Sequence, residues 1–192
     1  MSLPVQRLSA SAREPYLAHL VALPANDARL RFGMPQRVAT IASYVARIDF
    51  DADVIFAVHG DALAIAGAAH LAFAGDFAEL GVSVLPHARR RGIGAALVAR
   101  AAEHARNRRT QRLHMHCLAE NAVMIRIAQR AGMTVVIESG DADGQLVLPP
   151  STPMSVTSEM LADRVALYDY ALKTNVETWR RMGVAMTGPS QT

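Results

Sequence analysis

Hydrophobic residues recur along the chain in short blocks whose spacing switches between that of a β-strand and that of an α-helix. Apolar runs bounded by turn residues predict strands at 3–8, 53–58, 63–73, 77–85, 112–118, 134–137 and 145–148. Apolar residues three and four positions apart predict helices that start near residue 11, at 26–48 with a break at Pro35, at 92–106 and at 121–131. Strands mixed with helices in this order predict an α+β fold, with helices on both faces of one sheet.

Turn and capping residues predict where several of these elements begin and end. Ser11-x-x-Glu14 is a capping-box pattern, which predicts the start of the first helix. Asn121 is expected to cap the helix at 121–131, and Gly132 is expected to end it. The polar run 139–144 is expected to form the turn of a closing hairpin.

The sequence after the last predicted strand forms a separate unit. A domain at 1–148 is followed by a Pro- and Ser-containing linker at 149–157 and by a C-terminal helix and tail at 158–192. One apolar stripe recurs at helical intervals along that helix: Leu161, Val165, Tyr168, Leu172, Val176, Trp179 and Met182. Side chains of this size must be buried, so we predict a homodimer through this helix. The alternative is that the helix packs on the chain's own sheet.

Positive charge is concentrated in one segment of the chain. The formal net charge is +3, and Lys173 is the only lysine, so arginine supplies nearly all of the positive charge. The crowded arginines are Arg89, Arg90, Arg91, Arg100, Arg106, Arg108, Arg109 and Arg112. Such a patch suits a polyanionic ligand such as a nucleotide phosphate, with nucleic acid as the rival. No aromatic residues are interleaved with the arginines and no nucleic-acid-binding motif is present, so we predict no nucleic-acid partner.

Cysteine content and hydropathy bear on the compartment. Cys117 is the single cysteine, so the chain cannot form an intramolecular disulfide, which is typical of a reducing compartment. The first residues lack an apolar signal core, and the longest apolar run, 62–74, is too short to span a bilayer. We therefore predict a cytoplasmic protein with no membrane partner. His114 and His116 share a strand face without a third ligand spaced to join them, so we predict no metal.

The segment from Arg89 to Ala95 has the spacing of an anion-binding turn. Arg89-x-x-Gly92-x-Gly94 follows a predicted strand and opens a predicted helix. A structural interpretation is that glycine makes a tight turn and the arginines form its solvated flank. The functional interpretation is a cradle in which backbone N–H groups at the helix N-terminus point at a phosphate.

This pattern resembles the Q/R-x-x-G-x-G/A signature of the GNAT acyltransferase superfamily. The later run LAENAVMIRIAQRAGM, at 118–133, is similar to the family element in which Asn opens a helix that ends in Gly and an apolar residue. The resemblance covers roughly 5–148, and AELGVSVLPHARRRGIG is also similar to bacterial Pat-type protein lysine acetyltransferases. It implies a GNAT-type α+β fold, with a mixed, mostly antiparallel sheet flanked by helices and a C-terminal helical extension.

The resemblance also implies acetyl-CoA as the cofactor. The phosphates would lie on the glycine loop, and the pantetheine arm would pair with the strand before it. The implied cofactor-binding residues are Val82, Ser83, Val84, Arg89, Arg90, Arg91, Gly92, Ile93, Gly94, Ala95 and Asn121. Gly92 and Gly94 are expected to let the backbone approach the pyrophosphate, while arginine suits phosphate through forked hydrogen bonds.

Two residues are candidates for the general base that acyl transfer to an amine requires. Glu79, ten residues before Arg89, matches the strand glutamate of the Pat-type pattern. His116, five residues before Asn121, lies where other family members carry a basic glutamate, and imidazole has a reference pKa of about 6.5. Ala128 stands where many members have a tyrosine that acts as the general acid, so the resemblance supplies no general acid for this chain.

These observations predict an acetyl-CoA-dependent N-acetyltransferase that acts by direct attack of a primary amine. The acceptor is either a small-molecule amine or a protein lysine, because the acceptor groove of the family is built from variable segments. The alternative function is a non-catalytic acyl-CoA-binding or regulatory module, which the alanine at position 128 favours.

Overall fold

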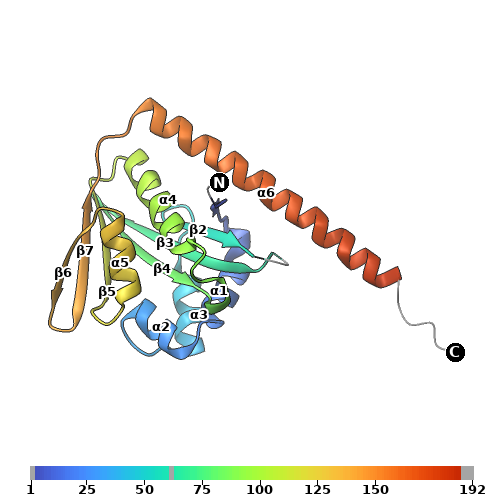
Figure 1. Cartoon of the computed structure of the whole chain (residues 1–192), viewed down its shortest axis with the longest axis horizontal. Helices are drawn as coiled ribbons and strands as arrows, with labels where there is room; N and C mark the ends of the chain where they lie inside the picture. The colour runs from blue at the N-terminus through green and yellow to red at the C-terminus, as the bar shows by residue number, and fades with distance from the viewer. Residues whose placement is uncertain (1–2, 61–62, 187–192) are drawn as a thin grey trace.

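The structure is a computed structural model that describes residues 3–60 and 63–186. One seven-stranded sheet forms its centre, with the strand order β1-β2-β3-β4-β5-β7-β6 (Figure 1). The strands are β1 (Gln6–Arg7), β2 (Val54–His59), β3 (Ile65–Ala74), β4 (Phe77–Val84), β5 (Arg112–Leu118), β6 (Thr134–Glu138) and β7 (Asp141–Val147). Neighbouring strands are antiparallel except for β4 and β5, which are parallel. The predicted mixed, mostly antiparallel α+β fold is confirmed.

Helices cover both faces of the sheet and enclose two hydrophobic cores. The helices are α1 (Arg13–Val21), α2 (Ala25–Phe32), α3 (Val38–Arg47), α4 (Ile93–Asn107), α5 (Ala122–Arg130) and α6 (Pro153–Met186), with the short 3-10 helices η1 (Ala10–Ala12) and η3 (Pro86–Ala88). Phe56 packs with residues of α4 and α5, whereas its neighbour Ile55 packs with residues of α1 and α3. Side chains alternate along a strand, so one strand serves both cores.

Two of the predicted element boundaries are confirmed and two are wrong. Asn121 caps α5, since its Oδ1 accepts a hydrogen bond from the N–H of Met124 at 3.2 Å, and Gly132 ends that segment with a φ of 88°. The capping box at Ser11 is wrong, because α1 begins at Arg13 after a 3-10 turn and no side chain caps it. The predicted turn 139–144 is also too long, because β7 already begins at Asp141.

The C-terminal helix begins earlier than predicted. α6 begins at Pro153 and not at Ser158, so residues 153–157 are helical and the predicted linker at 149–157 is shortened. The start is fixed by a reciprocal cap: the Thr152 hydroxyl accepts from the N–H of Ser155 at 3.1 Å, and the Ser155 hydroxyl accepts from the N–H of Thr152 at 3.0 Å. Pro suits this first helical position, where its missing N–H costs no helix hydrogen bond.

Polar side chains dock the first half of α6 on α4. The Glu159 carboxylate accepts hydrogen bonds from Arg100 at 3.0 Å, from Asn107 at 2.6 Å and from His104 at 2.5 Å. Asp163 accepts a second bond from Arg100 at 2.6 Å. Although burial alone would raise it, the hydrogen bonds from His104 and Asn107 lower the pKa of Glu159 from 4.5 to about 2.

This docking predicts a stability that depends on Glu159 and on pH. The Glu159 carboxylate has a lower pKa in the folded protein than in the unfolded chain. Its contribution to the free energy of unfolding is therefore complete above about pH 4.5 and is lost as the pH falls towards 2. We expect Glu159→Gln to lower stability by about 1–3 kcal/mol near neutral pH, since hydrogen bonds to a charged group are lost. Thermal melts followed by circular dichroism test this. The difference in stability between the wild type and Glu159→Gln is expected to disappear in acid. A variant that melts like the wild type at neutral pH would contradict the prediction.

The predicted apolar stripe of α6 lies on the solvent side. Leu161, Val165, Tyr168, Leu172 and Val176 are 53–74% exposed. The side chains of Trp179 and Met182 lie outside the part that is described. Figure 1 shows the C-terminal half of α6 extending beyond the sheet. The stripe itself therefore does not pack on the chain's own sheet at the described positions, whereas other residues of α6 do contact the sheet: Tyr170 packs on His59, and Lys173 donates to the His59 carbonyl at 3.1 Å.

Candidate functional site

An opening between β4 and β5 forms the centre of the candidate site. These strands pair at Phe77 with Arg112, at Ala78 with Leu113 and at Glu79 with His114, and the described register contains no further pair between them. The rest of β4 stays paired with β3 up to Val84, so its edge towards β5 is open. An open strand edge offers N–H and C=O groups to an extended ligand. The predicted pantetheine-binding residues Val82, Ser83 and Val84 lie on this segment.

The glycine loop connects β4 to the N-terminus of α4. Gly92 precedes the helix with a φ of 78°, and Arg90 also has a positive φ, of 59°. The N–H groups of Ile93, Gly94 and Ala95 are in the first turn of α4, where no helix carbonyl is available to them. Together with the positive end of the helix dipole, these N–H groups form a site suited to an anion.

The two glycines of the loop serve different purposes. Gly92 is exposed, and its positive φ is a conformation that side chains with a Cβ adopt at a cost. Gly94 is buried, and a Cβ there would lie 2.9 Å from Cδ1 of Ile127 on α5. Helix packing therefore gives one reason for the absence of a side chain at Gly94.

The structure divides the predicted arginine patch. Arg90 and Arg91 are exposed beside the α4 N-terminus. Arg89 is already engaged, because it donates to the carbonyl of Val84 at 3.3 Å and forms an ion pair with Asp27 of α2. Others are used elsewhere: Arg100 docks α6, Arg108 lies over the Phe73 ring and Arg112 pairs with Asp76. Of the arginines named, Arg90 and Arg91 therefore remain exposed at the loop.

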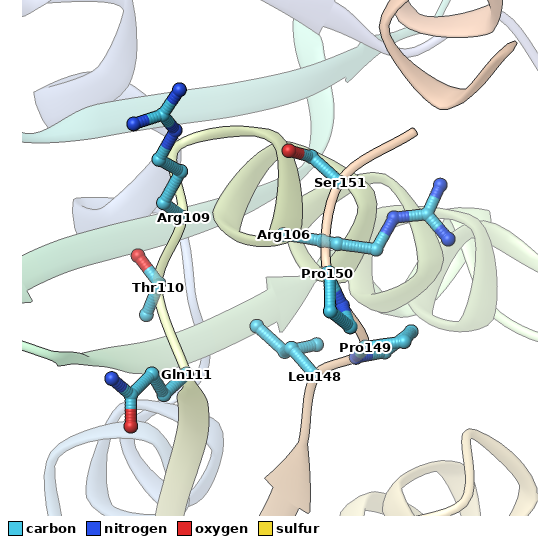
Figure 2. A pocket seen from close by; sticks show the side chains of 8 residues that line it. All are labelled: Arg106, Arg109, Thr110, Gln111, Leu148, Pro149, Pro150 and Ser151. Atoms are coloured by element: carbon cyan, nitrogen blue, oxygen red, sulfur yellow. The ribbon is translucent and has the colours of Figure 1, made fainter. Parts of the chain in front are cut away.

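The far end of α4 carries a separate pocket, which Figure 2 shows. Its lining comes from the end of α4, the start of β5 and the segment before α6: Arg106, Arg109, Thr110, Gln111, Leu148, Pro149, Pro150 and Ser151. The guanidinium groups of Arg106 and Arg109 point away from each other (Figure 2). The pocket therefore does not gather positive charge at one point, and we assign it no ligand.

Glu79 lies where β4 and β5 separate. It forms the last register pair with His114, and its side chain is exposed. Phe77, two residues earlier on the same face, packs edge to face on the His114 ring with 5.4 Å between ring centres. Glu79 therefore presents a carboxylate at the closed end of the opening, at the position expected for a base.

His116 lies further along β5 and is held by acidic residues of β7. Its Nδ1 is 2.9 Å from Asp143, and its Nε2 is 3.6 Å from Asp141. The hydrogen bond to Asp143 and the nearby carboxylates raise the pKa of His116 above its ordinary value. These carboxylates therefore hold the imidazole of His116 in its protonated form to a higher pH than usual, and a base must be unprotonated to accept a proton.

Ser83 belongs to a buried hydrogen-bonded chain that the sequence did not reveal. The Ser83 hydroxyl lies 2.8 Å from Nε2 of His19, whose Nδ1 lies 2.9 Å from the carbonyl of Ile65. Burial lowers the pKa of His19 to about 4, so the ring is neutral at physiological pH. Nδ1 then donates to Ile65, and Nε2 accepts from Ser83. The chain fixes β4 to α1 beside its open edge, and the signal in the sequence was a lone histidine on an apolar helix face.

The remaining candidates lie in the core or in caps. Ala128 is fully buried in the core beneath α5, and Asn121 is occupied as the helix cap. Cys117 lies in the core, and burial raises its pKa to about 11. The described residues contain no cluster of three His, Cys, Asp or Glu side chains that could hold a metal. Within the same residues, no helix is long and apolar enough to cross a bilayer.

Comparisons with known proteins agree with this geometry. The model of the acetyltransferase (GNAT) family matches residues 25–133. No curated protein sequence matches the chain at a significant level. The GNAT domain of PAT from S. lividans is similar in structure, with a TM-score of 0.67 and 23% identity over 75% of this chain and 89% of that one.

Two further structures show the same fold at lower identity. A Salmonella typhimurium structure solved with its cofactor acetyl-CoA has a TM-score of 0.56 and 17% identity, over 79% of this chain and 97% of that one. The ribosomal-protein-S18-alanine N-acetyltransferase from Escherichia coli has a TM-score of 0.55 and 18% identity, over 77% of this chain and 94% of that one.

Proposed function

The chain belongs to the acetyltransferase (GNAT) family, and we propose that it transfers an acetyl group from acetyl-CoA to a primary amine by direct attack. The observation that carries this proposal is the joint placement of three features. The open edge of β4, the unbonded N–H groups of α4 and the exposed Glu79 follow one another along a single strand–loop–helix unit.

We assign binding of the cofactor to the backbone more than to the arginine side chains. The N–H groups from Arg90 to Ala95 hold the phosphates, and the exposed side chains of Arg90 and Arg91 add positive charge. The open edge from Val82 to Val84 pairs with the pantetheine amides. Because its side chain caps α5, Asn121 contributes to cofactor binding by positioning that helix.

The chemistry requires a neutral amine and a stabilised oxyanion. Acetyl-CoA supplies the acetyl group as a thioester, whose sulfur departs with the bonding electron pair. Glu79 accepts the proton that the amine loses, so that the nitrogen lone pair is free to attack. The N–H groups on the open edge of β4 are the donors available to the developing oxyanion.

We propose a cationic acceptor, either a small amine or a protein lysine. Exposed carboxylates near the opening, from Glu79, Asp141 and Asp143, attract an ammonium group. A protein lysine is supported by the Pat-type run from Ala78 to Gly94 and by the likeness to the S. lividans domain. The single buried Cys117 supports a cytoplasmic location.

Release of free CoA thiol tests the proposed function. Purified protein is incubated with acetyl-CoA and with panels of small amines and of lysine-containing proteins, and acetylated products are identified by mass spectrometry. We expect thiol release that depends on the acceptor. Tight CoA binding without turnover on any acceptor would favour the non-catalytic module, which the buried Ala128 supports.

We further propose that α6 joins two copies of the chain. Met154, Leu161, Val165, Tyr168, Leu172 and Val176 recur at intervals close to the 3.5-residue repeat of paired helices, and each is more than half exposed. Their exposed area is on the order of the roughly 800 Å² that one partner contributes to a stable interface. A symmetric pair of helices would bury the same stripe of each copy against the other.

Light scattering tests this dimer with two matched variants. We expect the wild type to have twice the mass of the 20.7 kDa chain and Leu161→Glu/Leu172→Glu to be monomeric, because charges replace two central contacts. Ala171→Glu adds a charge at an exposed position beside the stripe and is expected to remain dimeric. A wild type that is monomeric at high concentration would contradict the proposal.

A further inference from the structure

Arg31 of α2 has a side chain whose placement the proposed chemistry does not explain. Its guanidinium lies against Gly81 of β4: a Cβ added to Gly81 would be 2.2 Å from Cζ, 2.2 Å from Nη2 and 2.4 Å from Nη1. Gly81 is therefore required for this arrangement. The guanidinium thus lies on the strand that carries Glu79, within the part of β4 whose edge is open.

The hydrogen-bonding capacity of Arg31 is only partly used. A guanidinium has five N–H donors. Arg31 donates to the Tyr44 hydroxyl at 3.3 Å and also interacts with the Tyr16 hydroxyl. Its Nε is buried without a hydrogen-bond partner, and its Cζ lies 5.0 Å from the centre of the Phe32 ring. A buried cation whose N–H donors lack partners is unfavourable unless a further group accepts hydrogen bonds from them.

Carboxylates near α2 are paired with residues other than Arg31. Asp27 pairs with Arg89, and Glu120 pairs with Arg29. Asp53 binds His70, which in turn contacts the Tyr44 hydroxyl at 2.5 Å, so Asp53 reaches Arg31 only through two other side chains. No ion pair to Arg31 is found among residues 3–60 and 63–186.

Glu79 lies two residues before Gly81, and side chains at this spacing point to the same face of the strand, about 7 Å apart. A carboxylate and a guanidinium at this separation suit a ligand that carries both an amine and a carboxylate. The amine would meet Glu79, and the carboxylate would form a forked, charge-assisted pair with Arg31.

We propose that Arg31 is a carboxylate-binding subsite of the acetyltransferase, completed when a ligand carboxylate lies against Gly81. This inference rests on the proposed function, because it assigns a substrate class to the same opening. The carboxylate has two sources with the same chemistry: an amino-acid-like acceptor, or an acyl group that ends in a carboxylate.

Two pairs of matched ligands distinguish these sources without requiring turnover. In the first arm, calorimetry in the presence of CoA compares a panel of α-amino acids with their α-amides. In the second arm, calorimetry compares succinyl-CoA with butyryl-CoA, which has an acyl chain of the same length and no carboxylate. We expect the wild type to bind the carboxylate member of one pair roughly 10–100-fold more tightly, as a hydrogen-bonded charge pair provides.

Variants at position 31 then assign that preference to the guanidinium. Arg31→Gln is expected to reduce the preference to less than about threefold, and Arg31→Lys, which keeps the charge without the fork, is expected to retain part of it. Arg47→Gln removes an exposed arginine of α3 and is expected to leave the preference unchanged.

The outcomes separate this inference from the proposed function. A wild type that shows no preference in either arm would overturn the subsite, even if Arg31→Gln fails to fold. A preference that persists unchanged in Arg31→Gln would overturn it as well. Absence of thiol release with every acceptor would contradict the proposed acetyl transfer but not the subsite. Both calorimetry experiments measure binding and do not depend on catalysis.

Discussion

We expect Glu79→Gln to turn over about 10²–10⁴-fold more slowly than the wild type, as loss of a general base generally does. The variant keeps the size of the side chain and removes its negative charge and its ability to accept a proton. Glu79 is exposed at the closed end of the opening, so folding and the CoA-binding loop are expected to be unaffected. Steady-state thiol release gives the turnover, and calorimetry with CoA is expected to give a dissociation constant close to that of the wild type.

His116→Gln is the matched control for this experiment. The carboxylates of Asp143 and Asp141 hold His116 in its protonated form to higher pH than usual, so its removal is expected to change turnover little. If His116→Gln is the inactive variant and Glu79→Gln keeps wild-type turnover, the two roles are exchanged. If both variants remain fully active, neither residue is the base.

The second large effect is expected at Gly92. We expect Gly92→Val to weaken CoA binding by roughly 100-fold or more, since a strained backbone costs about 1–2 kcal/mol and each lost amide bond to a phosphate roughly 1.5–3 kcal/mol. Its φ of 78° is the reason, because valine at this position forces the loop out of the conformation that aims the N–H groups. Calorimetry with CoA measures the change, and circular dichroism checks the fold.

Gly75→Val provides the control for backbone strain. Gly75 also has a positive φ, of 60°, and has open space around it at the turn between β3 and β4. It carries the same conformational cost far from the loop, so CoA binding is expected to be retained. Gly94 is unsuitable for this comparison, because a side chain there would strike Ile127 and disturb the packing of α5. Undiminished CoA binding by a folded Gly92→Val protein would contradict the assignment of the phosphate site.

Sequence patterns correctly predicted the features that are determined by residues close together in the chain. The strand–loop–helix unit around Gly92, the Asn121 cap and the Gly132 stop are set within a few positions, and all three are present. The six-residue polar turn was wrong for a non-local reason. Residues 141–144 have low strand propensity, yet they form strand because β5 and β6 bond to them from both sides. Gly144 also fits there because a Cβ would lie 2.8 Å from Met115.

The charges near the opening could not be placed from sequence. The partners of Arg31 are Tyr16, Tyr44 and Phe32 with the backbone at Gly81, and these come from α1, α3, α2 and β4. No local spacing connects them. The separate positions of the crowded arginines could not be predicted for the related reason that neighbours in sequence point to different faces of α4 and its loops.

The strand order also bears on how the chain completes its fold during synthesis. β7 is the last strand to leave the ribosome, yet it is inserted between β5 and β6, and β6 pairs with no other strand in the described sheet. A nascent chain that ends before residue 141 therefore leaves β6 unpaired and β5 bonded only by its short parallel contact with β4. Pairing between strands distant in sequence is slow and leaves strand edges exposed in the meantime. β5, which borders the opening, is therefore held in place by β7 only after residue 147 has emerged. Fragments truncated before β7 are thus expected to be substrates for chaperones and proteases, even though they contain the entire glycine loop.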